Sequence, residues 1–188
     1  MNTVRSIALF SLSLAVPLLA AAADQPRYAA DVVQSSLAKR SGSPLVDKVR
    51  HGTARFKDVN VAIAEDWVPA TPCVSGPNSG AMGVHFVLPE RVGDGAVNGE
   101  EPEALIYEPL GNGALRLVGV EFIVPVDSWT GANPPAVDGH LMNLVGEPNR
   151  YGLHAFYELH VWAWQQNPEG NFADWNTTVN CDRQAAEE

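Results

Sequence analysis

Strand-like runs separated by turns rich in glycine and proline occupy the chain beyond residue 80, and they constrain the fold more than any other feature. The runs cover residues 82–88, 104–108, 115–124 and 153–164, and β-branched and aromatic residues are frequent in them. The segment Gly111-Asn112-Gly113 separates two of the runs and predicts a hairpin, because these residues accept positive φ at little cost. A last extended piece is expected at residues 177–181. Strands joined by such turns predict an antiparallel sheet.

The segment before these runs has a helical pattern. Ser43 can cap a helix, Pro44 suits its first turn, and apolar residues recur at helical spacing from there to Trp67. Gly52 weakens the middle, so the pattern fits either one helix or two shorter ones. A further short helix is predicted at residues 31–39. Helices followed by strands predict a mainly β (α+β) domain, an antiparallel barrel or sandwich preceded by one or two N-terminal helices.

The N-terminus resembles a signal peptide. Arg5 precedes an apolar run at residues 7–20, and three alanines then satisfy the small-residue rule for cleavage before Asp24. The run is too short for a comfortable membrane span, and no later stretch reaches the roughly 20 apolar residues that a span needs. We therefore expect a signal peptide at residues 1–23 and a mature protein in the periplasm or secreted.

The remaining residues, 24–188, are expected to form one globular domain, with a helical segment at 24–70 and a β-rich core at 73–182. The chain has two cysteines, Cys73 and Cys181, whose spacing matches neither a CxxC redox motif nor a cysteine zinc site. Export would take both into an oxidising compartment. One structural disulfide is therefore the simplest expectation.

The chain is acidic, with a formal net charge of −10 at pH 7. This charge argues against nucleic acid and against an anionic membrane surface as partners. Residues 24–60 are locally basic, with seven Lys and Arg against four Asp. This segment is a candidate for pairing with a second copy of the chain in a homodimer.

Histidines and glutamates within the strand-like runs are the residues most able to carry chemistry. Strict alternation puts His154, Glu158 and His160 on one face of the run at 153–164, together with aromatic residues. Glu121 and His85 likewise lie among apolar residues of two other runs. A buried charge is costly unless it is paired or bound to a metal, and imidazole and carboxylate are ligands of zinc, copper and iron. The sequence predicts one transition metal ion bound by His85, Glu121 and His160, with His154 or Glu158 assisting.

Two other interpretations compete with the metal site. In the first, Phe156, Trp162, Glu158 and Tyr107 form an aromatic and polar pocket for a small organic ligand without metal. In the second, the polar residues have structural roles only, and Glu121 pairs with Arg116 or Arg150. The motifs of nucleotide-binding loops and of serine hydrolases do not occur in the sequence. The sequence does not specify a reaction.

Four segments together resemble a family of uncharacterised exported bacterial proteins. The resemblance covers roughly residues 50–182, and its segments are Ala81–Phe86 (AMGVHF), Pro102–Pro109 (PEALIYEP), Leu117–Phe122 (LVGVEF) and Tyr157–Trp164 (YELHVWAW). It implies a periplasmic or secreted protein of a Gram-negative bacterium. The family has no established activity, so the resemblance implies no catalytic residue. His85, Glu121 and His160 fall within these segments.

Overall fold

The computed structural model describes residues 43–184. The expected signal peptide at 1–23 and the expected helix at 31–39 lie outside these residues. Among the described residues, no helix is long and apolar enough to cross a membrane.

The first described elements are short helices. They are α2 (Pro44–Thr53), the 3-10 helix η1 (Ala54–Lys57) and α3 (Val59–Ala64). The helical pattern that the sequence carries over residues 43–67 is therefore divided into three. Asp58 ends η1 in an extended conformation, and its side chain accepts the Asn60 N–H at 3.0 Å, which caps α3.

Gly52 has a packing role within α2. A Cβ at this position would lie 2.0 Å from the carbonyl oxygen of Glu100, so only glycine lets the 98–101 loop pass this close to the helix. The glycine does not end the helix, which continues to Thr53.

The remaining elements are mainly strands. In chain order they are β1 (Val68–Pro69), β2 (Val74–Gly76), β3 (Gly80–Val87), the short helix α4 (Pro89–Val92), β4 (Ala104–Gly111), β5 (Ala114–Pro125), the 3-10 helix η2 (Val126–Ser128), β6 (Ala136–Val137), β7 (His140–Leu141), β8 (Asn143–Val145) and β9 (Phe156–Val161).

An antiparallel sheet forms the centre of the described part, with the strand order β1-β3-β4-β5-β9-β8 and β2 paired to β3. Strands β6 and β7 form a separate two-stranded ribbon. The large sheet runs from β1 to β8 without closing, so the mainly β class and the antiparallel pairing are confirmed and the barrel alternative is not realised among the described residues. The hairpin at Asn112 is also confirmed, with φ of 51° at that residue.

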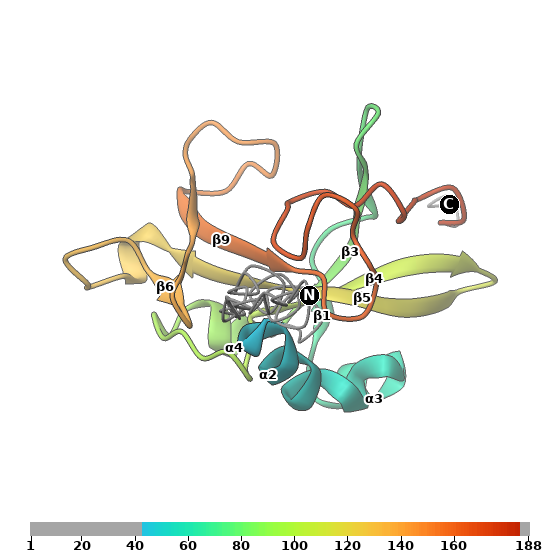
Figure 1. Cartoon of the computed structure of the whole chain (residues 1–188), viewed down its shortest axis with the longest axis horizontal. Coiled ribbons are helices and arrows are strands. Elements are labelled where there is room, and N and C mark those ends of the chain that lie inside the picture. The colour runs from blue at the N-terminus through green and yellow to red at the C-terminus, as the bar shows by residue number, and fades with distance from the viewer. Residues whose placement is uncertain (1–42, 185–188) are drawn as a thin grey trace, which may run out of the picture. The chain divides into compact units, whose positions relative to one another are not determined.

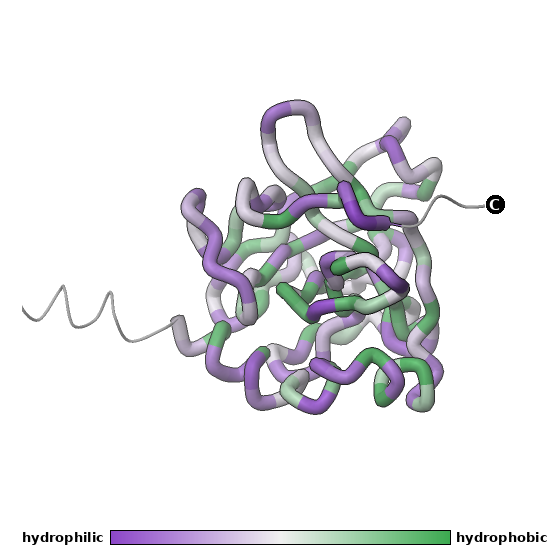
Figure 2. Tube along the Cα trace, turned by 90° about the vertical axis from the view of Figure 1, so that its right-hand side faces the viewer, coloured by the Kyte–Doolittle hydropathy of each residue, from purple (hydrophilic) through white to green (hydrophobic). Residues whose placement is uncertain are grey.

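The two faces of the sheet are covered differently. In Figure 1 the helices α2, α3 and α4 lie on one side of the long strands, and the loops before and after β9 lie on the other. The helix side holds the main apolar core, which includes Phe56, Trp67, Tyr107, Phe122 and Val161. In Figure 2, many apolar residues lie toward the middle of the trace, and polar residues are frequent around its edge.

Two expectations about strand ends are wrong. The run at 153–164 is a strand only over Phe156–Val161, and residues 177–181 form no strand. The C-terminal segment instead pairs through one isolated bridge between Ala81 and Asn176. It is also fastened by the expected disulfide, Cys73–Cys181, which closes a loop with a sequence separation of 108 residues.

Candidate metal centre

The sheet brings three of the predicted ligands together on the face opposite the helices. His85 comes from β3, Glu121 from β5 and His160 from β9. Glu121 lies directly opposite His160, and directly opposite residues of antiparallel strands point to the same face. His85 lies opposite Ile106 of the intervening strand β4, which contributes only apolar side chains here.

A β-bulge near Ile106 changes the face of residues that precede Glu121. Leu117 lies opposite Tyr107 and Gly119 opposite Ile106, so Val118 is the extra residue. Leu117 therefore packs into the helix-side core, whereas Glu121 faces the other side. Strict alternation would put Leu117 and Glu121 on one face, and the bulge is the reason that they lie on opposite faces.

The three side chains are buried and close enough to share an ion. His85, Glu121 and His160 are 5%, 5% and 1% exposed, and one ligand atom of each lies within 4.8 Å of the other two. His85 Nε2 and Glu121 Oε2 are 3.4 Å apart. Two ligands of a tetrahedral zinc ion, each about 2.0–2.2 Å from the metal, are separated by about 3.3–3.6 Å. This pair already has the spacing of two ligands of one ion.

Thr71 orients the His85 ring. The Thr71 hydroxyl oxygen lies 3.1 Å from His85 Nδ1 and accepts the backbone N–H of His85 at 3.3 Å. When Nδ1–H donates to this hydroxyl, the lone pair of the ring is on Nε2, the atom that faces Glu121. Such a partner on the second ring nitrogen is typical of metal-binding histidines.

His160 has an unusual environment. Neither of its ring nitrogens has a hydrogen-bond partner among the described residues, although the side chain is fully buried. A buried polar atom without a partner costs about 1–3 kcal/mol, and native structures contain few of them. A ligand bound to this ring would remove that cost.

Burial keeps both histidines neutral. It lowers the pKa of His85 to about 4, although a backbone contact with Gly83 opposes the shift. Burial, together with the nearby His85 charge, lowers the pKa of His160 to about 3. Both rings are therefore uncharged at neutral pH, and each keeps a lone pair that can bind a metal.

The pKa values of the carboxyl groups in the cluster are shifted in the opposite direction, upward. Burial raises the pKa of Glu121 well above its usual value, and the charge of the neighbouring Glu158 raises it further. Burial also raises the pKa of Glu158. These shifts favour the protonated form of the carboxyl groups in the metal-free cluster, and a divalent cation would displace such protons because it compensates the buried negative charge.

Sequence reasoning did not find one acidic member of the cluster, Asp174. One ligand atom each of Glu158, His160 and Asp174 also lie within 4.8 Å of one another, and His160 Nδ1 is 4.0 Å from Asp174 Oδ1. Asp174 follows β9 in a loop, so no strand periodicity points to it. A weak signal was available, since it is an acidic residue between two aromatic ones, Phe172 and Trp175.

A small cavity lies beside two members of the cluster, His85 and Glu121. Its volume is about 70 Å³, and its lining residues are Ala70, Thr71, His85, Val87, Glu121, Ile123, Tyr151, Leu153 and Phe156. A wider groove of about 540 Å³ shares Ala70, Thr71, Tyr151 and Leu153 with it. The cavity has the volume of a few water molecules beside Glu121, and it adjoins the groove at these four residues.

The other predicted site residues lie in several places. Glu158 belongs to the cluster, and Phe156 lines the cavity. His154 precedes β9, is largely exposed and lies 3.2 Å from Glu147, so the structure does not bring it to the cluster.

Two aromatic residues of the predicted metal-free pocket also lie elsewhere. The Tyr107 hydroxyl donates to the Phe56 carbonyl at 2.7 Å on the helix side. Trp162 packs in a second apolar cluster with Ala81, Ile106, Val118 and Val179. The four residues of that pocket therefore do not meet.

The predicted structural pairing of Glu121 with an arginine is also not realised. Arg116 pairs with Glu108, and the Arg150 guanidinium lies over the Trp175 ring.

Comparisons with known proteins add no assignment. No family model, no curated protein and no solved structure matches this chain. The class of protein that the fold and the cluster define is a disulfide-bonded, mainly β protein with a buried group of histidines and carboxylates able to hold a metal ion.

Proposed function

We propose that this protein binds a divalent transition metal ion through His85, Glu121 and His160. The observation that carries the proposal is the fully buried His160 ring, whose two nitrogens have no partner. It supports a metal because His85 and Glu121 lie beside it with ligand atoms at suitable spacing. A purely structural histidine would be expected to donate and accept hydrogen bonds instead.

The ligand types favour zinc, copper or iron as the bound metal. Two imidazoles and one carboxylate form a borderline nitrogen and oxygen ligand set, and hard ions such as calcium prefer oxygen ligands alone. Cysteine thiolates are not offered, since both cysteines are in the disulfide. Three protein ligands leave at least one coordination position for water or another small molecule, and the cavity beside Glu121 can accommodate it.

We also propose that the protein acts outside the cytoplasm. The disulfide supports this, because such bonds persist in oxidising compartments. The apolar N-terminal segment and the resemblance to exported bacterial proteins point in the same direction.

Metal titration of the disulfide-bonded protein, prepared without a His-tag and stripped with a chelator, tests the proposal. Zinc competed against a chromophoric chelator should bind tightly to the wild type. We expect His85→Ala and His160→Ala each to weaken that binding by at least 100-fold, because each removes a direct ligand. His154→Ala is the matched control and should bind zinc as the wild type does, since His154 is exposed and outside the cluster.

Two results would contradict the proposal. One is a wild type that takes up no zinc, copper or iron. The other is equal binding by the wild type and by His160→Ala, which would place the metal elsewhere. Far-UV circular dichroism shows whether each variant is folded, so that loss of binding is not confused with loss of structure.

A further inference from the structure

His160 belongs to two groups of potential ligands, and both of its ring nitrogens are unpartnered and buried. One group contains His85 and Glu121, and the other contains Glu158 and Asp174. We propose a second cation position formed by Glu158, His160 and Asp174, so that the imidazole of His160 bridges two metal ions. This inference depends on the proposed function, because the first ion occupies the site described above.

The distance between His160 and Asp174 fits a shared ion and does not fit a direct hydrogen bond. His160 Nδ1 and Asp174 Oδ1 are 4.0 Å apart. A hydrogen bond between nitrogen and oxygen is about 2.7–3.2 Å long. Two ligands that are each about 2.0–2.2 Å from one metal are separated by about 3 to 4 Å, depending on the coordination angle. Asp174 therefore does not simply orient the ring.

Glu158 supplies a second carboxylate to this position. It is two residues before His160 on β9, so both side chains lie on the same face of the strand. Its Oε2 atom is buried and has no hydrogen-bond partner within residues 43–184. The second position thus has its own unpartnered oxygen in addition to the free nitrogen of His160.

The loop that carries Asp174 is held in place on both sides of this residue. The Trp162 indole N–H donates to the Ala173 carbonyl at 2.6 Å, and the Asn167 side chain donates to the Trp175 carbonyl at 2.8 Å. Asp174 is therefore a pre-positioned carboxylate, which reduces the entropy lost when it binds an ion.

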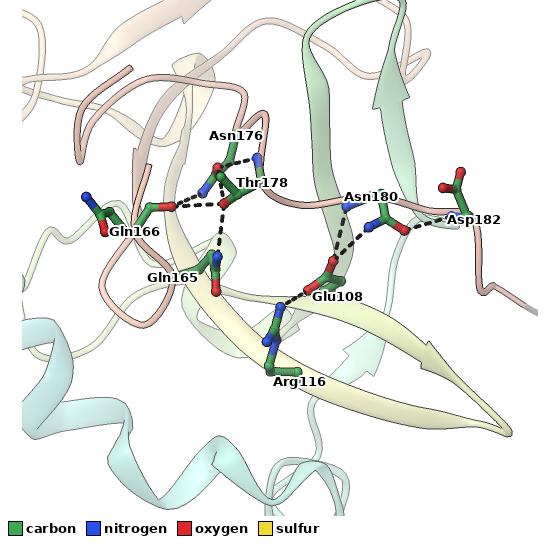
Figure 3. A network of polar contacts seen from close by, with 8 residues as sticks. All are labelled: Glu108, Arg116, Gln165, Gln166, Asn176, Thr178, Asn180 and Asp182. Carbon is green, nitrogen blue, oxygen red and sulfur yellow. Dashed lines mark hydrogen bonds and ion pairs between the residues drawn. The ribbon is translucent and has the colours of Figure 1, made fainter. Parts of the chain in front are cut away.

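The chain that follows this loop is also fastened to the rest of the domain. Asn180 donates through its backbone N–H and its side chain to the buried Glu108, which also pairs with Arg116 (Figure 3). Asn176 and Thr178 bond to the 165–166 segment in the same view. These contacts keep the whole segment, and with it the Asp174 loop, close to β9.

The two cation positions open to different parts of the surface. Asp174 lines a hollow of about 300 Å³ together with Asn78, Ser79, Glu169, Ala173, Trp175 and Thr177. None of these residues lines the cavity beside His85 and Glu121. The hollow at Asp174 is therefore separate from the cavity at the first position.

Bridging has a defined proton balance. A neutral imidazole has one nitrogen lone pair and one N–H, so the first ion takes the lone pair. The second ion must displace the N–H proton, which leaves to solvent, and the ring becomes an imidazolate bound at both nitrogens. Zinc and copper are the expected ions, since imidazole suits both.

Counting the bound ions tests the inference. Native mass spectrometry and elemental analysis of protein saturated with zinc should give two ions per chain for the wild type. Asp174→Asn should retain one ion, because the first position keeps all its ligands. Glu169→Gln is the matched control, since Glu169 lines the same hollow outside the ligand group, and it should retain two.

The outcomes separate this inference from the proposed function. No bound ion in the wild type would overturn both. One ion in the wild type would overturn the second position and leave the first intact. Two ions that both remain in Asp174→Asn would also overturn the assignment of Asp174.

Electron paramagnetic resonance of the copper-loaded protein tests the bridge itself. An imidazolate couples the spins of two copper ions, so the signal should grow with the first equivalent of copper and fall with the second. If the second equivalent of copper instead adds a signal equal to that of the first, the bridge is excluded.

Discussion

Replacement of His160 by leucine should stabilise the metal-free protein while it abolishes metal binding. The His160 ring is fully buried, and its N–H and its lone pair both lack partners. Each buried, unpartnered polar atom costs about 1–3 kcal/mol, which places the gross cost of the two atoms at roughly 2–6 kcal/mol. Leucine has a similar volume and no polar atom, but its different shape would cost up to about 1.5 kcal/mol. After that full shape cost, we expect a net gain of roughly 0.5–4.5 kcal/mol in free energy of unfolding.

Urea unfolding in the presence of a strong chelator measures this gain. The midpoint should move to higher urea with an unchanged slope, because the variant exposes the same surface on unfolding. His154→Leu is the control, and its exposed side chain should change stability by less than about 0.5 kcal/mol. A loss of stability in His160→Leu would refute the reasoning, since it would mean that the ring is satisfied in the metal-free protein and has a structural role.

Three further predictions concern pH and the disulfide. Glu103 is 3% exposed, accepts the Ile123 N–H, and burial raises its pKa to about 8. A carboxyl group whose pKa is raised in the folded state stabilises the fold below pH 4.5, the usual pKa of the group. This contribution to stability is lost as the pH rises to 8. Thermal unfolding at pH 9 should therefore show Glu103→Gln to be more stable than the wild type, by up to about 5 kcal/mol, whereas the exposed Glu101→Gln should not differ. Zinc affinity, measured by competition titration, should fall by at least tenfold between pH 7 and pH 5. The reason is that protons compete with zinc for the carboxyl groups of Glu121 and Glu158, whose pKa values are raised. A constant affinity would contradict the ligand assignment. Removal of the disulfide by Cys73→Ser/Cys181→Ser should cost about 2–5 kcal/mol in urea unfolding, and an unchanged midpoint would show that the bridge does not restrain the unfolded chain.

Local patterns predicted the features that depend on local geometry. The hairpin at Asn112 and the strands that carry the site follow from alternation and turn residues, and the structure confirms them. His85, Glu121 and His160 meet because each is a buried polar residue inside a strand and the three strands are close in the sheet. Adjacency of β5 and β9 was not deducible from alternation, since it depends on the long connection between them.

The errors have physical causes that the sequence does not display. Alternation was extended to His154, but β9 begins only at Phe156, so His154 lies in the connection before the strand. Tyr107 was assigned to a pocket, although it is on the helix side of β4, where its hydroxyl has a partner. Asp174 was missed because hydrogen bonds from distant residues, Trp162 and Asn167, position its loop. Such contacts between segments far apart cannot be read from periodicity.

The central claim is that His85, Glu121 and His160 share one metal ion, and anomalous diffraction from crystals of the metal-loaded protein tests it most directly. Data collected on either side of the absorption edge of the bound metal locate the ion independently of any assumed ligand. The account predicts an anomalous peak about 2.0–2.3 Å from a ring nitrogen of His85, a ring nitrogen of His160 and a carboxylate oxygen of Glu121. A peak only at surface groups such as His154 and Glu147, with none between these three side chains, would contradict it.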